Sequence, residues 1–95
     1  MITNKNDANK AAVLERLSDV RTALKNQPQT PDVARALEQC DRLELAIRQF
    51  HAEGLRFAAF TLLRLVFASG TAFTEPVHIA TQNLKSALET AGYPH

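Results

Sequence analysis

Cysteine, glycine and proline are scarce in this chain of 95 residues, and tryptophan is absent. The one cysteine, Cys40, cannot form an internal disulfide, which excludes a small secreted scaffold held by disulfides. A surplus of one charge sign is also missing, because 11 lysine and arginine residues stand against 10 acidic residues. Basic and acidic residues are interleaved, so no basic stripe forms and we expect no nucleic-acid partner.

A long apolar run is missing as well. The most hydrophobic stretch, residues 55–69, contains Arg56 and Arg64. A membrane-spanning helix needs ~20 apolar residues, and an arginine at bilayer depth costs at least ~2.5 kcal/mol. We therefore expect a buried helix and no membrane span. The first ten residues are polar and lack the apolar segment of a secretory signal, which predicts a cytoplasmic location.

What the chain does contain is a hydrophobic fraction of 45%, arranged with helical spacing. Its length predicts one domain over residues 1–95. A flexible segment 1–6 and a first helix over about residues 7–25 are expected, since apolar side chains recur there at spacings of four, three and four. These residues are Val13, Leu17, Val20 and Leu24. No segment alternates strictly in the way of a half-buried strand, so the predicted fold class is all-α.

The second helix has a strong start signal at Thr30, Pro31 and Asp32. From Ala36 onward, the apolar pattern, with positions alternately four and three residues apart, continues through Gly54 without a slip. This pattern predicts one long central helix over residues 31–69, about 55 Å long at ~1.5 Å per residue. The alternative is a break near Gly54, which gives a bundle of four helices.

The last helix is expected over residues 75–91. Thr74, Glu75 and Pro76 provide its start, and Gly92 followed by Pro94 provides its end. Ser69 and Gly70 separate it from the long helix. The predicted architecture is therefore a small bundle of three helices, or of four if the chain breaks near Gly54.

Beyond Gly54 the predicted long helix is apolar on nearly every side. A helix of this kind must be covered all round, and two neighbouring helices leave an exposed patch larger than monomers usually tolerate. We therefore predict a homodimer in which the two long helices pack on each other. The predicted interface consists of Leu55, Phe57, Phe60, Leu63, Arg64 and Phe67. If the helix breaks near Gly54, its second half becomes the central helix of a monomeric bundle instead.

A carrier of a small apolar or anionic amphiphilic ligand is the alternative function. A stripe of phenylalanines would then line a cavity, and an arginine would meet the ligand's anionic head group. The ligand-binding residues predicted on this interpretation are Phe50, Arg56, Phe60 and Arg64.

His51 lies in the segment FHAEGLRFAAF, where it is followed closely by a glycine. This segment resembles histidine phosphotransfer domains, in which an exposed histidine on a helical bundle accepts a phosphoryl group. The resemblance covers about ten residues and implies a phosphotransfer role for His51. The family's lysine and glycine after the histidine are replaced here by Gly54 and Leu55.

Metal binding and catalysis find little support in the sequence. Cys40, Glu44 and His51 fall on one half of the predicted helix, but Cys40 and His51 lie ~16 Å apart along it and cannot share one ion within a chain. There is no glycine-rich phosphate loop and no nucleophile elbow. We expect no catalytic residue, metal or cofactor. The favoured hypothesis is a non-enzymatic protein that acts by self-association or by receiving an amphipathic helix of another protein.

Overall fold

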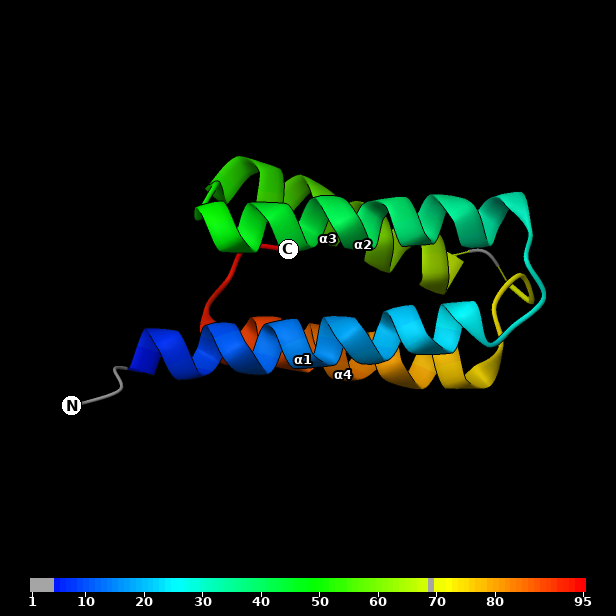
Figure 1. Ribbon diagram of the computed structural model, residues 1–95, viewed down its shortest axis with the longest axis horizontal. Helices are drawn as coiled ribbons and strands as arrows, with labels where there is room; N and C mark the ends of the chain where they lie inside the picture. Colours follow the sequence, from blue (N-terminus) through cyan, green and yellow to red (C-terminus); the bar gives the residue numbers. More distant parts are fainter. Residues whose placement is uncertain (1–4, 69) are drawn as a thin grey trace.

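The chain folds into an all-α bundle of four helices. The computed structural model describes residues 5–68 and 70–95, and no strand occurs in either range. The helices are α1 (Lys5–Lys25), α2 (Pro31–Gln49), α3 (Ala52–Ala68) and α4 (Glu75–Ala91). Figure 1 shows two layers, with α1 beside α4 in one and α2 beside α3 in the other. The predicted all-α class is confirmed.

The core fills the space between the two layers. Each helix contributes one buried stripe, as expected when an amphipathic helix covers one side of a common core. In α1 the predicted residues Val13, Leu17, Val20 and Leu24 are all fully buried. Cys40 is also fully buried, which places this small side chain in the core. Among the described residues, Phe73 in the α3–α4 loop is the only phenylalanine that is buried.

The start signals read from the sequence function as expected in α2. The Thr30 side chain accepts a hydrogen bond from the Val33 N–H at 3.2 Å, and Pro31 occupies the first turn. Helix α1 begins at Lys5, so Lys5 and Asn6 are helical rather than flexible; residues 1–4 lie outside the described part of the chain. Helix α4 has the expected bounds, and Gly92 ends it in the left-handed conformation with φ 72°.

The prediction of one continuous helix over residues 31–69 is wrong. Helix α2 ends at Gln49, and α3 begins at Ala52 and runs back along it. Phe50 takes the left-handed conformation, with φ 53° and ψ 39°. The Phe50 N–H donates to the Ile47 carbonyl and the His51 N–H to the Ala46 carbonyl, which together form a Schellman ending. The predicted helix of about 55 Å also exceeds the longest dimension of the molecule, 44 Å.

The alternative of four helices is therefore the correct one, with the break at Phe50 and His51 rather than at Gly54. No serine, threonine, aspartate or asparagine directly precedes α3, and His51 supplies the cap instead. Its Nδ1 accepts a hydrogen bond from the Gly54 N–H at 3.0 Å, as a serine or asparagine does at other helix starts. The predicted end at Ser69 lies outside the described residues, whereas Gly70 does adopt a positive φ of 61°.

The apolar spacing that argued for a continuous helix does not describe the core of α3. On that spacing Gly54, Phe57 and Thr61 would continue the buried stripe of α2. Phe57 is instead 63% exposed, and Gly54 and Thr61 are only half-buried. The buried stripe of α3 consists of Leu55, Ala58, Ala59, Leu62, Leu63 and Val66. Because α3 is apolar on most sides, its sequence fits both stripes, and tertiary packing selects one of them.

Two polar contacts tie the elements together. The Gln27 side chain donates to the Ala72 carbonyl at 3.2 Å and accepts from the Thr74 N–H at 3.0 Å, which joins the α1–α2 loop to the α3–α4 loop. This carboxamide also caps the start of α4, where the Thr74 side chain makes no capping bond. On α1, Arg21 donates to Asp41 at 3.0 Å and pairs with Glu44, both on α2.

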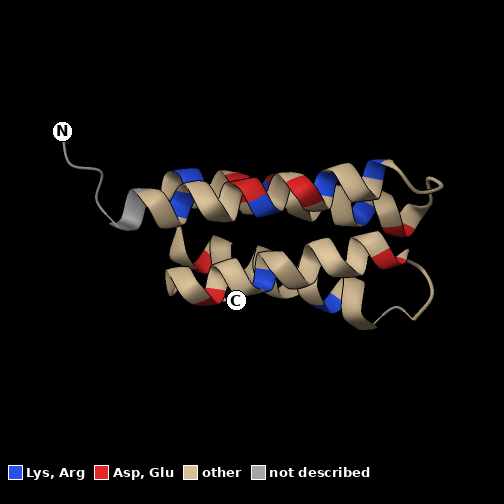
Figure 2. Ribbon diagram, turned by 90° about the horizontal axis from the view of Figure 1, so that it is seen from below, with Lys and Arg blue, Asp and Glu red and all other residues tan. Residues whose placement is uncertain are grey.

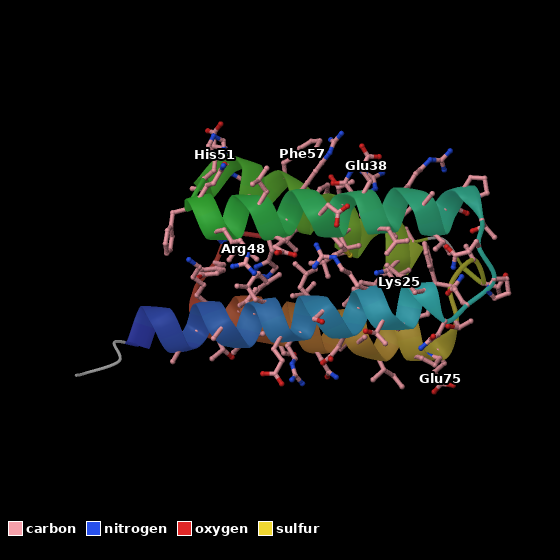
Figure 3. All side chains as sticks on the ribbon, viewed as in Figure 1. Lys25, Glu38, Arg48, His51, Phe57 and Glu75 are labelled. Atoms are coloured by element: carbon pink, nitrogen blue, oxygen red, sulfur yellow. The ribbon has the colours of Figure 1, made fainter. Side chains whose placement is uncertain are left out.

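The ion pair between the layers shifts the titration of both partners. Burial lowers the pKa of Arg21, but its hydrogen bond and attraction to Glu44 outweigh burial and raise the pKa overall. The pKa of Glu44 is held below its usual value, first by a hydrogen bond from Arg48 at 2.9 Å and then by Arg21. Both groups are therefore charged at neutral pH. Figure 3 shows Arg48 on the side of α2 that faces α1.

Candidate functional site

The exposed side of α3 carries most of the chain's aromatic surface. Phe57, Phe60 and Phe67 are 63%, 51% and 42% exposed. They lie within about three turns of each other on the side of the helix opposite the buried stripe. We call Phe57, Phe60, Arg64 and Phe67 the phenylalanine face. Figure 3 shows Phe57 on the outer side of the bundle, turned away from α1.

Two shallow hollows on the phenylalanine face meet at Phe57 and Phe60. One, of about 530 Å³, continues along α3 and is lined by Phe57, Phe60, Thr61, Arg64, Leu65 and Ala68. The other continues toward the start of α3 and is lined by Glu53, Arg56, Phe57, Phe60 and His95. Both hollows are open to solvent. These phenylalanines therefore lie on the surface of the bundle, whereas the carrier hypothesis placed phenylalanines around a cavity.

Few charges surround this face. Helices α3 and α4 contain three charged residues each, whereas α1 contains eight and α2 seven. In Figure 2 the charged residues gather on the side of α1 and α2, and the side of α3 and α4 is sparsely charged. A large apolar surface with few charges is typical of a protein–protein interface and unusual on a free monomer surface.

The arginines of α3 differ from those of the other helices. Arg16, Arg21, Arg35, Arg42 and Arg48 each form an ion pair with a carboxylate. Within residues 5–68 and 70–95, no carboxylate lies at ion-pairing distance of Arg56 or Arg64, and both side chains are exposed. Two cations next to exposed phenylalanines are therefore free to meet an anionic group from outside.

The predicted interface residues divide between the surface and the core. Phe57, Phe60, Arg64 and Phe67 are exposed and belong to the phenylalanine face. Leu55 and Leu63 are 4% and 9% exposed, so they stabilise the bundle itself and offer little area to another molecule. The Phe67 ring lies 6.0 Å from the His78 ring of α4, centroid to centroid, which connects the face to the neighbouring helix.

Phe50 does not join the phenylalanine face, although it is 63% exposed. It lies at the corner between α2 and α3, where the Lys10 ammonium of α1 is 4.8 Å from its ring centroid. The two phenylalanines predicted to bind the carrier's ligand, Phe50 and Phe60, are thus divided between a corner and a helix face. The apolar residues Leu45 and Ile79 are also exposed, but they border grooves formed by other helices.

His51 is exposed and has a structural role at the start of α3. Because its Nδ1 accepts the Gly54 N–H, the proton of the neutral ring is on Nε2. The phosphotransfer hypothesis stays a prediction from sequence, and the capping bond accounts for a histidine at this position.

Cys40 is buried on α2, and burial raises the pKa of its thiol to about 12. Among the described residues, no three histidine, cysteine or acidic side chains are grouped as metal ligands.

Sequence reasoning missed the part that Glu53 plays at this face. Glu53, Phe57, Phe60 and Arg64 follow one another at spacings of four, three and four, which is the signal of one helix side. The predicted interface began at Leu55 and so did not include Glu53, two residues earlier. No helix in the described part of the chain has the length and hydropathy needed to cross a membrane. The cytoplasmic location stays a prediction.

Comparison with protein-family models, with curated proteins and with solved structures finds no match for this chain. The surface of α3 itself is therefore the feature that points to a function.

Proposed function

We propose that this chain is a non-enzymatic helical module that acts through protein–protein interaction, and that the phenylalanine face of α3 is its interaction surface. The observation that carries the proposal is the exposure of Phe57, Phe60 and Phe67 on one helix whose opposite side already completes the core. Four helices bury a full core here without these rings. The exposed halves of these rings are therefore not needed to complete the core.

Burial of the phenylalanine face against another molecule is energetically favourable. Burial of apolar surface contributes ~25 cal/mol per Å², so three half-exposed phenylalanines offer several kcal/mol to association before its entropic cost. Aromatic residues and arginine are the types enriched at the centres of interfaces. We propose a second copy of the chain as the molecule that covers the face, because a two-fold dimer buries the same patch on both subunits at once.

The test is the solution mass by light scattering over a concentration series, for the wild type, Phe60→Glu and Ile79→Glu. Ile79 is a matched control because it is 55% exposed, close to the 51% of Phe60, but it borders the groove between α1 and α4. We expect a dimer of twice the 10.5 kDa chain for the wild type and Ile79→Glu, and a folded monomer for Phe60→Glu. A wild type that is monomeric up to millimolar concentration would overturn the proposal.

A further inference from the structure

The outer side of α3 is self-complementary in charge. Glu53 lies at one end of the two hollows and Arg64 at the other, with Phe57 and Phe60 between them. At ~100° per residue the eleven positions from Glu53 to Arg64 return to within ~20° of the same side, so the four residues form one straight stripe. Read in either direction, the stripe is a charge, two phenylalanines and the opposite charge.

Neither charge of the stripe has an ion-pair partner among the described residues of its own chain. Glu53 and Arg64 lie ~16 Å apart along the helix axis, which is too far for them to pair with each other. Among the residues that the structure describes, no ion pair involves Glu53, and Arg64 has no carboxylate partner either. The described carboxylates of α1 and α2 from Glu15 onward are paired, whereas those of α3 and α4 are not.

From this stripe we infer that two copies of the chain associate with their α3 helices antiparallel, so that Glu53 of each meets Arg64 of the other. This inference rests on the proposed self-association and specifies its geometry. In an antiparallel pair centred between Phe57 and Phe60, Glu53 faces the partner subunit's Arg64. Phe57 then faces the partner subunit's Phe60. One two-fold axis produces two ion pairs and two aromatic contacts.

The parallel arrangement is disfavoured by the same residues. With the two helices parallel and in register, Arg64 would face the partner subunit's Arg64, and the two Glu53 carboxylates would also meet. Like charges placed opposite each other at an interface are destabilising, and such pairs select against the wrong geometry. The stripe is also short, since it spans only three turns of helix. We therefore expect a dissociation constant in the micromolar range, typical of small interfaces.

Charge exchange tests the geometry. The variants are Glu53→Arg, Arg64→Glu, the double variant carrying both changes, and Glu89→Arg on α4 as a control with the same charge change at an exposed site. We expect each single change to weaken self-association at least tenfold, because it places two pairs of like charges in the dimer. The double variant should recover a dissociation constant within about threefold of the wild type, and Glu89→Arg should leave it unchanged.

Mixing the two single variants gives a second readout. Neither Glu53→Arg nor Arg64→Glu should dimerise well alone, but an equimolar mixture should form a heterodimer, since both of its contacts then join opposite charges. Raising the salt concentration should weaken the wild-type dimer for the same reason. Circular dichroism of each variant confirms that it is folded, so that a lost dimer is not a lost fold.

The outcomes separate this inference from the proposed function. If the wild type dimerises and Phe60→Glu abolishes the dimer, but the single charge variants keep the wild-type dissociation constant, the antiparallel geometry is overturned and the interaction surface stands. A failure of the double variant to recover would also overturn the geometry. If the wild type is a monomer at all concentrations, the proposed self-association is overturned together with it.

Discussion

At the start of α3, the His51 imidazole fills the space that a side chain on residue 54 would occupy. The Gly54 N–H donates to His51 Nδ1 at 3.0 Å. A Cβ built on Gly54 would lie 2.7 Å from that same nitrogen. A side chain at residue 54 would therefore displace the capping ring of His51. Both residues belong to the segment whose helix break the sequence pattern concealed.

A double-mutant cycle should detect this coupling. His51→Ala removes the cap, and we expect a loss of about 1 kcal/mol in the free energy of unfolding. Gly54→Ala gains ~1 kcal/mol of helix propensity but displaces the capping ring, so its net effect in the wild type should be close to zero. In the His51→Ala background, Gly54→Ala should stabilise by about 1 kcal/mol. Equal effects of Gly54→Ala in the two backgrounds, measured by urea denaturation, would contradict the capping role.

The left-handed conformation of Phe50 gives a second test of the break. Phe50→Gly and Phe50→Ala both lose the ring and its contact with Lys10, so comparing them isolates the backbone. In the observed turn glycine should be more stable than alanine by about 1 kcal/mol, because alanine is strained at positive φ. In a continuous helix the order would be reversed by a similar amount. Thermal and urea unfolding of the two variants decides the sign.

Gln27 should contribute more to the free energy of unfolding than an ordinary polar side chain does. It is 8% exposed and bonds to both Ala72 and Thr74 of the opposite loop. Gln27→Ala leaves the partly buried Ala72 carbonyl and Thr74 N–H without this partner, and we expect a loss of about 2 kcal/mol in the free energy of unfolding. Gln29→Ala is the control, because the exposed Gln29 bonds only to carbonyls of its own loop and helix end. A loss at Gln27 no larger than at Gln29 would show that the two loops are not held by this contact.

Because of Cys40, we expect the free energy of unfolding to decrease at alkaline pH. Burial raises the pKa of its thiol to about 12, whereas a thiol in an unfolded chain ionises near ~8.5. Above that pH the unfolded chain loses a proton that the native chain retains. The stabilisation is therefore complete below about pH 8.5 and falls by ~1.4 kcal/mol per pH unit as the pH rises toward the native pKa.

The measurement compares the wild type with Cys40→Ala, which cannot ionise at this position. Between pH 8 and pH 10 we expect the wild type to lose on the order of 1–2 kcal/mol more than the variant. Alkylation by iodoacetamide at pH 8 should also be slow in the folded chain and fast in urea. Parallel pH profiles for the two proteins would show that Cys40 ionises normally in the fold.

The sequence was sufficient for the elements whose signals are local. Thr30 with Pro31, the stripe of α1 and the glycine after α4 each act within one or two turns, and each has the expected effect. The break at Phe50 could not be read in the same way. It depends on a phenylalanine in a conformation that favours glycine and on a histidine in the place of a usual cap.

The candidate site shows the same limit. The sequence identified an apolar surplus on α3, and it named Phe57, Phe60, Arg64 and Phe67. The predicted alternative made the second half of a broken helix the central helix of a bundle, whereas the four-helix bundle leaves three of these phenylalanines exposed. Which half of an all-apolar helix is buried depends on the shape of its neighbours, and that information is not periodic in the sequence.

The pairing of α1 with α4 has a consequence for the order in which the chain can fold. The first and last helices form one layer, so residues 26–74 close a long loop between them. Helices α2 and α3 are joined by a tight turn and can pair early, because little chain entropy opposes a local contact. During synthesis α1 lacks its main neighbour until α4 has left the ribosome, because α2 contacts it less extensively. Part of the buried stripe of α1 is therefore exposed for that interval, which is when the nascent chain is most prone to aggregate.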